Sequence, residues 1–157
     1  MSLAFDRSEW FGFDKAAEVP CPLLRRENTC AIFSRLAAEG HAGCANFDCY
    51  GAGRVSELFG GRSWRDDPDR ARIMFSAFRR LKDVHELQLL LHEAARLDLP
   101  EAYASRVRQL LAVLEPEPPL TLDGLDGLDL RARSAEVHAL LRELRPFAAH
   151  RRLPLLR

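Results

Sequence analysis

Hydrophobic residues recur at three- and four-residue steps along the second half of the chain, which is the period of a helix. The longest such segment predicts a helix over residues 68–97, because Asp66 and Asp67 supply an acidic N-cap and Pro68 suits the first turn. The same spacing predicts helices over 100–115 and 131–145. The residues that recur at these steps along the long helix are Ala71, Met74, Phe75, Phe78, Leu81, His85, Leu89, His92 and Ala95.

Shorter helices are predicted over residues 30–39 and from about 54 to 59, ended by Gly40 and by Gly60-Gly61. Residues 120–130 contain Gly124 and Gly127 and are predicted to form turns. No segment alternates with the period of a strand. The pattern therefore predicts an all-α fold, an irregular or orthogonal bundle of about five helices with a cysteine-rich, loop-rich N-terminal stretch.

A length of 157 residues is typical of one domain, so we expect a single domain over 1–157. Its parts are an aromatic leader over 1–20, a cysteine stretch over 21–53, a helical bundle over 54–145 and a basic tail over 146–157. The leader is dense in aromatic residues, and we expect it to pack onto the core.

All four cysteines lie in the cysteine stretch, at Cys21, Cys30, Cys44 and Cys49. Four thiolates satisfy a tetrahedral zinc ion, and the same set binds an iron–sulfur cluster. The surrounding glycines and prolines predict turns or helix ends at most of these thiols. The sequence therefore predicts a metal site formed by the four cysteines. Asp48 and nearby backbone N–H groups would tune its thiolates.

Two details of the stretch bear on the thiols. Cys30 is predicted to open a helix with Asn28 or Thr29 as N-cap, and a helix N-terminus favours the thiolate. His41 lies three residues before Cys44, and we expect it to be an exposed loop histidine.

Other interpretations of the cysteines stay open. The four-residue gap between Cys44 and Cys49 is wider than the two-residue gap typical of zinc fingers. The chain could be a thiol redox sensor or disulfide protein. Alternatively, the thiols could be ordinary buried side chains of an interaction module that contacts a protein partner through the aromatic leader or the basic tail.

Several short motifs carry resemblances to known families. C-P-L-L at 21–24, C-A-I-F at 30–33 and G-C-A-N-F-D-C at 43–49 resemble the cysteine-cluster domains described as zinc- or iron-chelating. With F-G-G-R-S-W-R-D-D-P at 59–68, M-F-S-A-F at 74–78 and H-E-L at 85–87, they are similar to the region preceding the repeats in a group of bacterial pentapeptide-repeat proteins. That resemblance implies a helical domain with the cysteines at its front, and no particular activity. Phe33 stands where the family pattern has His, and no pentapeptide repeats follow.

Charge and motif content narrow the function classes. Lys plus Arg and Asp plus Glu number 23 each, and a formal net charge of zero argues against nucleic acid as a partner. We expect neither a membrane span nor a signal peptide, and a cytoplasmic protein. The His85-Glu86 and His92-Glu93 pairs lie seven residues apart, about 10.5 Å along a helix, so they cannot share one metal. No catalytic arrangement is visible, which favours a non-enzymatic protein.

Overall fold

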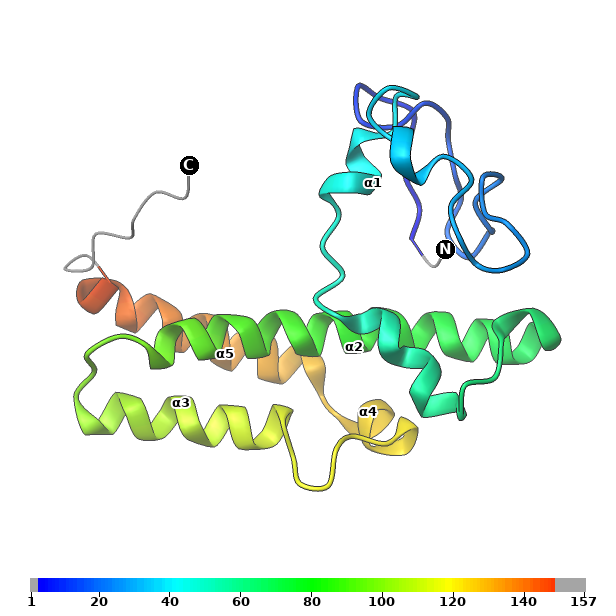
Figure 1. The fold of residues 1–157 in the computed structure, drawn as a ribbon. Helices are drawn as coiled ribbons and strands as arrows, with labels where there is room; N and C mark the ends of the chain where they lie inside the picture. Colours follow the sequence, from blue (N-terminus) through cyan, green and yellow to red (C-terminus); the bar gives the residue numbers. More distant parts are fainter. Residues whose placement is uncertain (1–2, 149–157) are drawn as a thin grey trace. The chain divides into compact units, whose positions relative to one another are not determined.

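The computed structural model describes residues 3–148, apart from the side chain of Asp66. Its α-helices are α1 (Ala42–Asn46), α2 (Pro68–Ala95), α3 (Glu101–Leu114), α4 (Leu122–Gly127) and α5 (Leu130–Ala148), as Figure 1 shows. Three 3-10 helices accompany them, η1 (Phe33–Arg35), η2 (Ala52–Phe59) and η3 (Trp64–Asp66). Between residues 3 and 148 there are isolated antiparallel bridges but no strand. The prediction of an all-α fold is confirmed.

The chain divides into two compact units, Met1–Arg79 and Arg80–Arg157. The division falls inside α2, so this helix contributes residues to both units. The single domain expected from the chain length stays a prediction. Most of the predicted basic tail, residues 149–157, lies outside the described residues.

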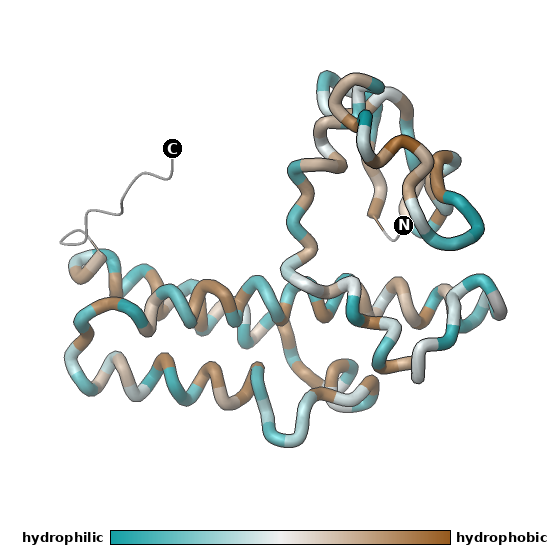
Figure 2. Tube along the Cα trace, viewed as in Figure 1, coloured by the Kyte–Doolittle hydropathy of each residue, from teal (hydrophilic) through white to brown (hydrophobic). Residues whose placement is uncertain are grey.

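In the second unit, the C-terminal part of α2 packs with α3 and α5. Gln88 on α2 donates a hydrogen bond to the Leu114 carbonyl at 2.8 Å, and the Tyr103 and Phe147 rings of α3 and α5 lie 5.5 Å apart. Figure 2 shows hydrophobic residues recurring between hydrophilic ones along these helices. The buried side chains of this unit are Val84, Leu87, Leu91, Ala94, Val107, Leu114, Leu125, Val137, Leu140 and Leu144.

The long helices begin and end close to their predicted bounds. The Asp67 carboxylate accepts a hydrogen bond from the Asp69 N–H at 2.9 Å, which caps the start of α2. The predicted helix over 100–115 is α3, which follows Pro100. The predicted helix over 131–145 is α5, which continues through Pro146 to Ala148.

Two local predictions are wrong. Residues 30–39 form only the three-residue η1, and Cys30 does not open a helix but pairs with Leu24 in an antiparallel bridge. The hairpin between them uses the backbone groups that a helix start would need, since the Arg25 N–H donates to the Thr29 carbonyl at 2.9 Å. Residues 122–127, expected to form turns, instead form α4, whose first turn is capped by the Thr121 hydroxyl.

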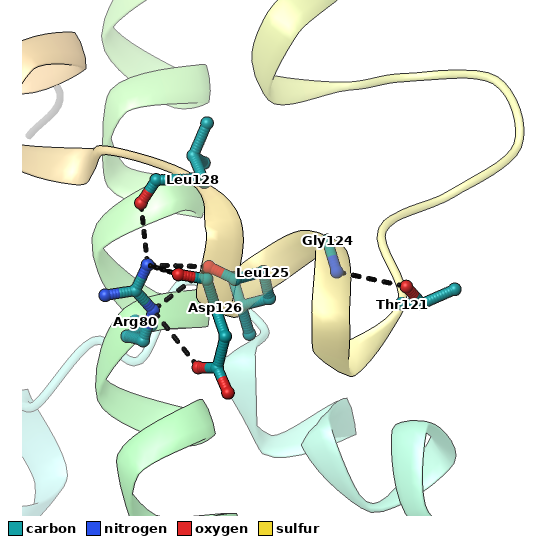
Figure 3. A network of polar contacts seen from close by, with 6 residues as sticks. All are labelled: Arg80, Thr121, Gly124, Leu125, Asp126 and Leu128. Carbon is teal, nitrogen blue, oxygen red and sulfur yellow. Dashed lines mark hydrogen bonds and ion pairs between the residues drawn. The ribbon is translucent and has the colours of Figure 1, made fainter.

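Arg80 fixes α4 against α2 in the second unit (Figure 3). Its guanidinium donates to the carbonyls of Leu125 and Leu128 at 2.6 and 2.7 Å, and pairs with the Asp126 carboxylate at 3.6 Å. The last carbonyls of a helix have no partner inside the helix, and a nearby cation satisfies both their hydrogen bonds and the helix dipole. The arginine thereby holds Leu125 in its fully buried position.

We expect Arg80→Ala to lower the free energy of unfolding by about 2 kcal/mol, because several carbonyls lose a charged donor in a partly buried place. Urea unfolding followed by circular dichroism measures the change. The control is Arg72→Ala on the same helix, whose ion pair with Asp69 is exposed and worth roughly 0.5 kcal/mol or less. Equal losses of stability from the two substitutions would contradict the conclusion that Arg80 holds α4 against α2.

Candidate functional site

The aromatic leader folds back on itself and onto the cysteine stretch. Phe5 and Lys15 exchange two backbone hydrogen bonds, at 3.0 and 2.8 Å. The Phe5 ring stacks on Phe11 with centroids 4.2 Å apart and lies 5.6 Å from Phe13. The Gly43 N–H donates a hydrogen bond to the Trp10 carbonyl at 3.0 Å, although the Trp10 side chain is exposed. These rings pack against one another and against the cysteine stretch, and that the leader packs onto the core stays a prediction.

His41 is buried, with 5% of its surface exposed, so the prediction of an exposed loop histidine is wrong. Its ring lies 4.7 Å from the Phe13 ring. A side chain at Gly12 would crowd it, since a Cβ there would lie 3.1 Å from the imidazole Nε2. The glycine and the aromatic leader together make the pocket that takes this histidine out of water.

Cys21 and Cys30 flank one tight hairpin. The Cys21 carbonyl accepts a hydrogen bond from the Leu24 N–H at 3.0 Å, and Leu24 forms the bridge with Cys30. Within the hairpin, Asn28 has a φ of 62°, a left-handed conformation that asparagine adopts more readily than most residues. The backbone therefore brings Cys21 and Cys30 to neighbouring positions despite the eight residues between them.

Cys44 and Cys49 lie on different local structures. Cys44 is in the middle of the short helix α1, whereas Cys49 comes just before a left-handed turn at Tyr50 and Gly51, with φ of 51° and 79°. The Asp48 carboxylate accepts from the Tyr50 N–H at 2.7 Å and so fixes this turn. None of the four cysteines forms a disulfide.

Three of the thiols are electrostatic neighbours. The pKa of the Cys44 thiol is raised, first by burial and then by negative charge on Cys21 and Cys30. Cys44 as a whole residue is exposed, but it lines a cavity of about 250 Å³ with Phe11 and Phe47, which accounts for the burial around its thiol. The thiols of Cys21 and Cys30 are therefore within electrostatic range of the Cys44 thiol.

Lys15 lines the same cavity and is a residue that the sequence did not single out. It is 6% exposed, and its ammonium donates to the carbonyls of Leu3 and Ala16 at 2.6 and 2.9 Å. Burial lowers the pKa of Lys15, while the charge of Cys21 raises it. A buried ammonium beside these cysteines supplies positive charge where thiolates would gather. A lone lysine in an aromatic-rich leader is the only sequence signal that could have suggested it.

The predicted metal ligands fit a metal in part. Their thiol chemistry is right for zinc or an iron–sulfur cluster, and Cys21 and Cys30 act electrostatically on Cys44. Across residues 3–148, however, no three His, Cys, Asp or Glu side chains are grouped as one metal's ligands. The fourth predicted ligand, Cys49, is not among the charges that act on Cys44. Binding one ion would require the sulfurs to move closer together.

Comparisons with known proteins identify one relative. The chain is 32% identical over 160 residues to the uncharacterized protein YybG of Bacillus subtilis (strain 168), a match that covers 98% of this chain. It spans 57% of the length of that relative. No protein-family model and no solved structure matches the chain. None of the helices within the described part of the chain is long and apolar enough to cross a membrane.

We expect Gly43→Ala to loosen the leader, because the new Cβ would lie 2.8 Å from two carbons of the Phe11 ring, closer than real contacts allow. Hydrogen exchange should show lower protection over residues 5–15. Gly53→Ala is the matched control, since its Cβ would meet nothing within 4 Å. Equal protection in the two variants would show that the ring does not pack against Gly43.

The raised pKa of Cys44 predicts slow alkylation in reduced, metal-free protein. Only the thiolate reacts, so a pKa above that of an ordinary thiol, about 8.5, leaves less reactive form at any pH below it. The rate of Cys44 labelling by iodoacetamide, followed by mass spectrometry, should therefore have its pH midpoint above that of a peptide with the sequence of residues 42–46. A pH midpoint of Cys44 labelling at or below that of the peptide would show that the pKa of the Cys44 thiol is not raised.

Proposed function

We propose that the leader and the cysteine stretch form a small metal-binding module, with Cys21, Cys30, Cys44 and Cys49 as ligands of zinc or an iron–sulfur cluster. The observation that carries this proposal is the lack of a core. Over residues 3–50, the buried residues are Lys15, Ile32 and His41, and only Ile32 is aliphatic. A segment of this size with so little apolar burial usually needs a metal or a disulfide to hold its shape.

The electrostatics of the thiols support the proposal. Negative charge on Cys21 and Cys30 opposes ionisation of Cys44, so a cation among them would relieve the repulsion and allow all of the thiolates to form. A bound metal would supply that charge. With four thiolate ligands it would have no open position for a substrate, so its role would be structural rather than catalytic.

A thiol redox role is the second candidate, and the same neighbourhood favours it. Cys21 and Cys30 flank one hairpin and act electrostatically on Cys44, and none of the three is in a disulfide, so oxidation could join two of them. The two candidates differ in one measurable respect. A redox protein would be purified without stoichiometric metal and would gain a reversible disulfide, whereas the metal module would contain metal and resist oxidation until the metal is removed.

A protein partner also remains a proposal. Trp10 is 48% exposed and Phe33 is 76% exposed, and large aromatic side chains of this kind are enriched at interfaces. These residues belong to the leader and to the cysteine stretch, so a partner surface would lie on the proposed module itself.

We expect protein purified without oxygen to contain about one equivalent of zinc, or iron and sulfide in cluster proportions. Each single Cys→Ser change at the four positions should abolish binding, because a structural site needs its full ligand set. The matched control is Ala45→Ser, next to Cys44 in the same helix and exposed. Less than about a tenth of an equivalent of metal in the parent protein would refute the proposal.

Removal of the metal should then loosen one part of the chain only. A strong chelator under reducing conditions should lower hydrogen-exchange protection over residues 15–60, because metal binding supplies folding free energy to a segment with little core. Helices α2, α3 and α5 should keep their protection, since they bury apolar faces of their own. Unchanged protection over residues 20–55 after verified metal loss would mean that the thiols are ordinary packed side chains.

A further inference from the structure

The first unit contains a cavity of about 540 Å³ that none of the predicted sites uses. It lies between the hairpin after Cys21, the two 3-10 helices η2 and η3, and the start of α2. Its volume is within the range of small-molecule binding sites. The lining residues are Leu24, Asn28, Gly53, Val55, Ser56, Gly61, Arg62, Ser63, Trp64, Met74, Phe75 and Phe78.

One wall of the cavity is aromatic and apolar. The Trp64 and Phe75 rings lie 5.6 Å apart at 49°, and Met74 and Phe75 are buried beneath the surface. Trp64 and Phe78 are only half-buried, so part of each ring remains available to a ligand. Rings held at fixed angles offer apolar contact to a flat, hydrophobic molecule at little cost in side-chain entropy.

Arg65 holds this wall in place. Its guanidinium lies 4.5 Å over the Trp64 ring and donates to the Asn28 side chain at 3.1 Å and to the Arg25 carbonyl at 2.9 Å. The tryptophan is therefore fixed between a cation and Phe75 before any ligand arrives. A preformed wall lowers the entropy lost on binding.

The cation that lines the cavity itself is Arg62, which is exposed. Neighbouring arginines are paired: Arg54 with Glu57 at 2.9 Å and Arg70 with Asp67 at 3.9 Å. Within the described part of the chain, the Arg62 side chain has no hydrogen bond or ion pair, and no acidic residue lines the cavity. An unpaired guanidinium beside an apolar pocket without carboxylates favours an anionic group.

We propose that this cavity binds a small organic anion with an aromatic or otherwise flat apolar body. The body would lie against Trp64, Phe75 and Phe78, and its carboxylate, sulfonate or phosphate would pair with Arg62. The hydroxyls of Ser56 and Ser63 and the Asn28 amide add polar groups at the same cavity. None of the proposed metal ligands lines this cavity.

The test uses 1-naphthoate as probe and its neutral counterpart 1-naphthamide. The chain has two tryptophans, so Trp10→Phe leaves Trp64 as the fluorescent reporter inside the site. Naphthoate should change this fluorescence in a saturable way and bind about threefold to tenfold more tightly than the amide, the range expected of a partly exposed charge pair. Arg62→Ala should remove the preference for naphthoate over naphthamide, and Arg62→Glu should make the protein bind naphthamide more tightly than naphthoate. Arg54→Ala, on the adjacent η2, should leave the preference unchanged.

Three results would overturn the proposal. Absence of a saturable change at millimolar naphthoate would mean that the cavity takes no such ligand. Equal binding of naphthoate and naphthamide would make it an apolar pocket, suited instead to a side chain from a protein partner. If Arg62→Ala still binds naphthoate more tightly than naphthamide, the carboxylate does not pair with Arg62. Thermal unfolding of each variant checks that the exposed substitution leaves the fold intact.

Discussion

The apolar face of α2 contributes buried side chains to both units of this protein. In the first unit it contributes Met74, Phe75 and Ala77, and in the second it contributes Val84, Leu87 and Leu91. A helix of 28 residues can do this because no glycine or proline interrupts it after Pro68 and because Asp67 caps its start. Changes that break the helix would therefore remove buried surface from both units.

The leader and the cysteine stretch obey a different constraint. Their buried residues include Lys15 and His41, whose polar groups need hydrogen-bond partners once they are removed from water. Their backbone also holds Glu18, Asn28 and Tyr50 in left-handed conformations, which disfavour residues with a side chain. Strain and a small core both reduce stability, and for this reason we propose that a metal bound by the thiolates supplies additional order to the segment.

The long helices could be predicted because their spacing and caps are local signals. Helix α4 could not, because Gly124 and Gly127 are typical of turns, while the carbonyl of Leu125 is satisfied by Arg80, 45 residues earlier in the chain. The hairpin around Cys30 is not predicted for a similar reason. Cys30 pairs with the backbone of Leu24, and the local N-cap signal that predicts a helix does not show this pairing. The cysteines themselves were evident. The burial of Lys15 beside Cys44 could not be predicted. It depends on Leu3, Phe5 and Phe11, which lie around Lys15 in the fold, and the spacing of residues in the sequence does not reveal these contacts.

The two proposed sites are linked through Arg65. The hairpin that it binds, at Arg25 and Asn28, lies between Cys21 and Cys30, and the ring that it covers, Trp64, is a wall of the cavity. Anything that orders the hairpin also restricts Arg65 and, through it, Trp64. Linkage is reciprocal: if a metal on the thiolates tightens binding in the cavity, a ligand in the cavity must tighten metal binding by the same factor. A single arginine, paired to the hairpin and stacked on the tryptophan, therefore gives two sites of different chemistry a physical means of affecting each other.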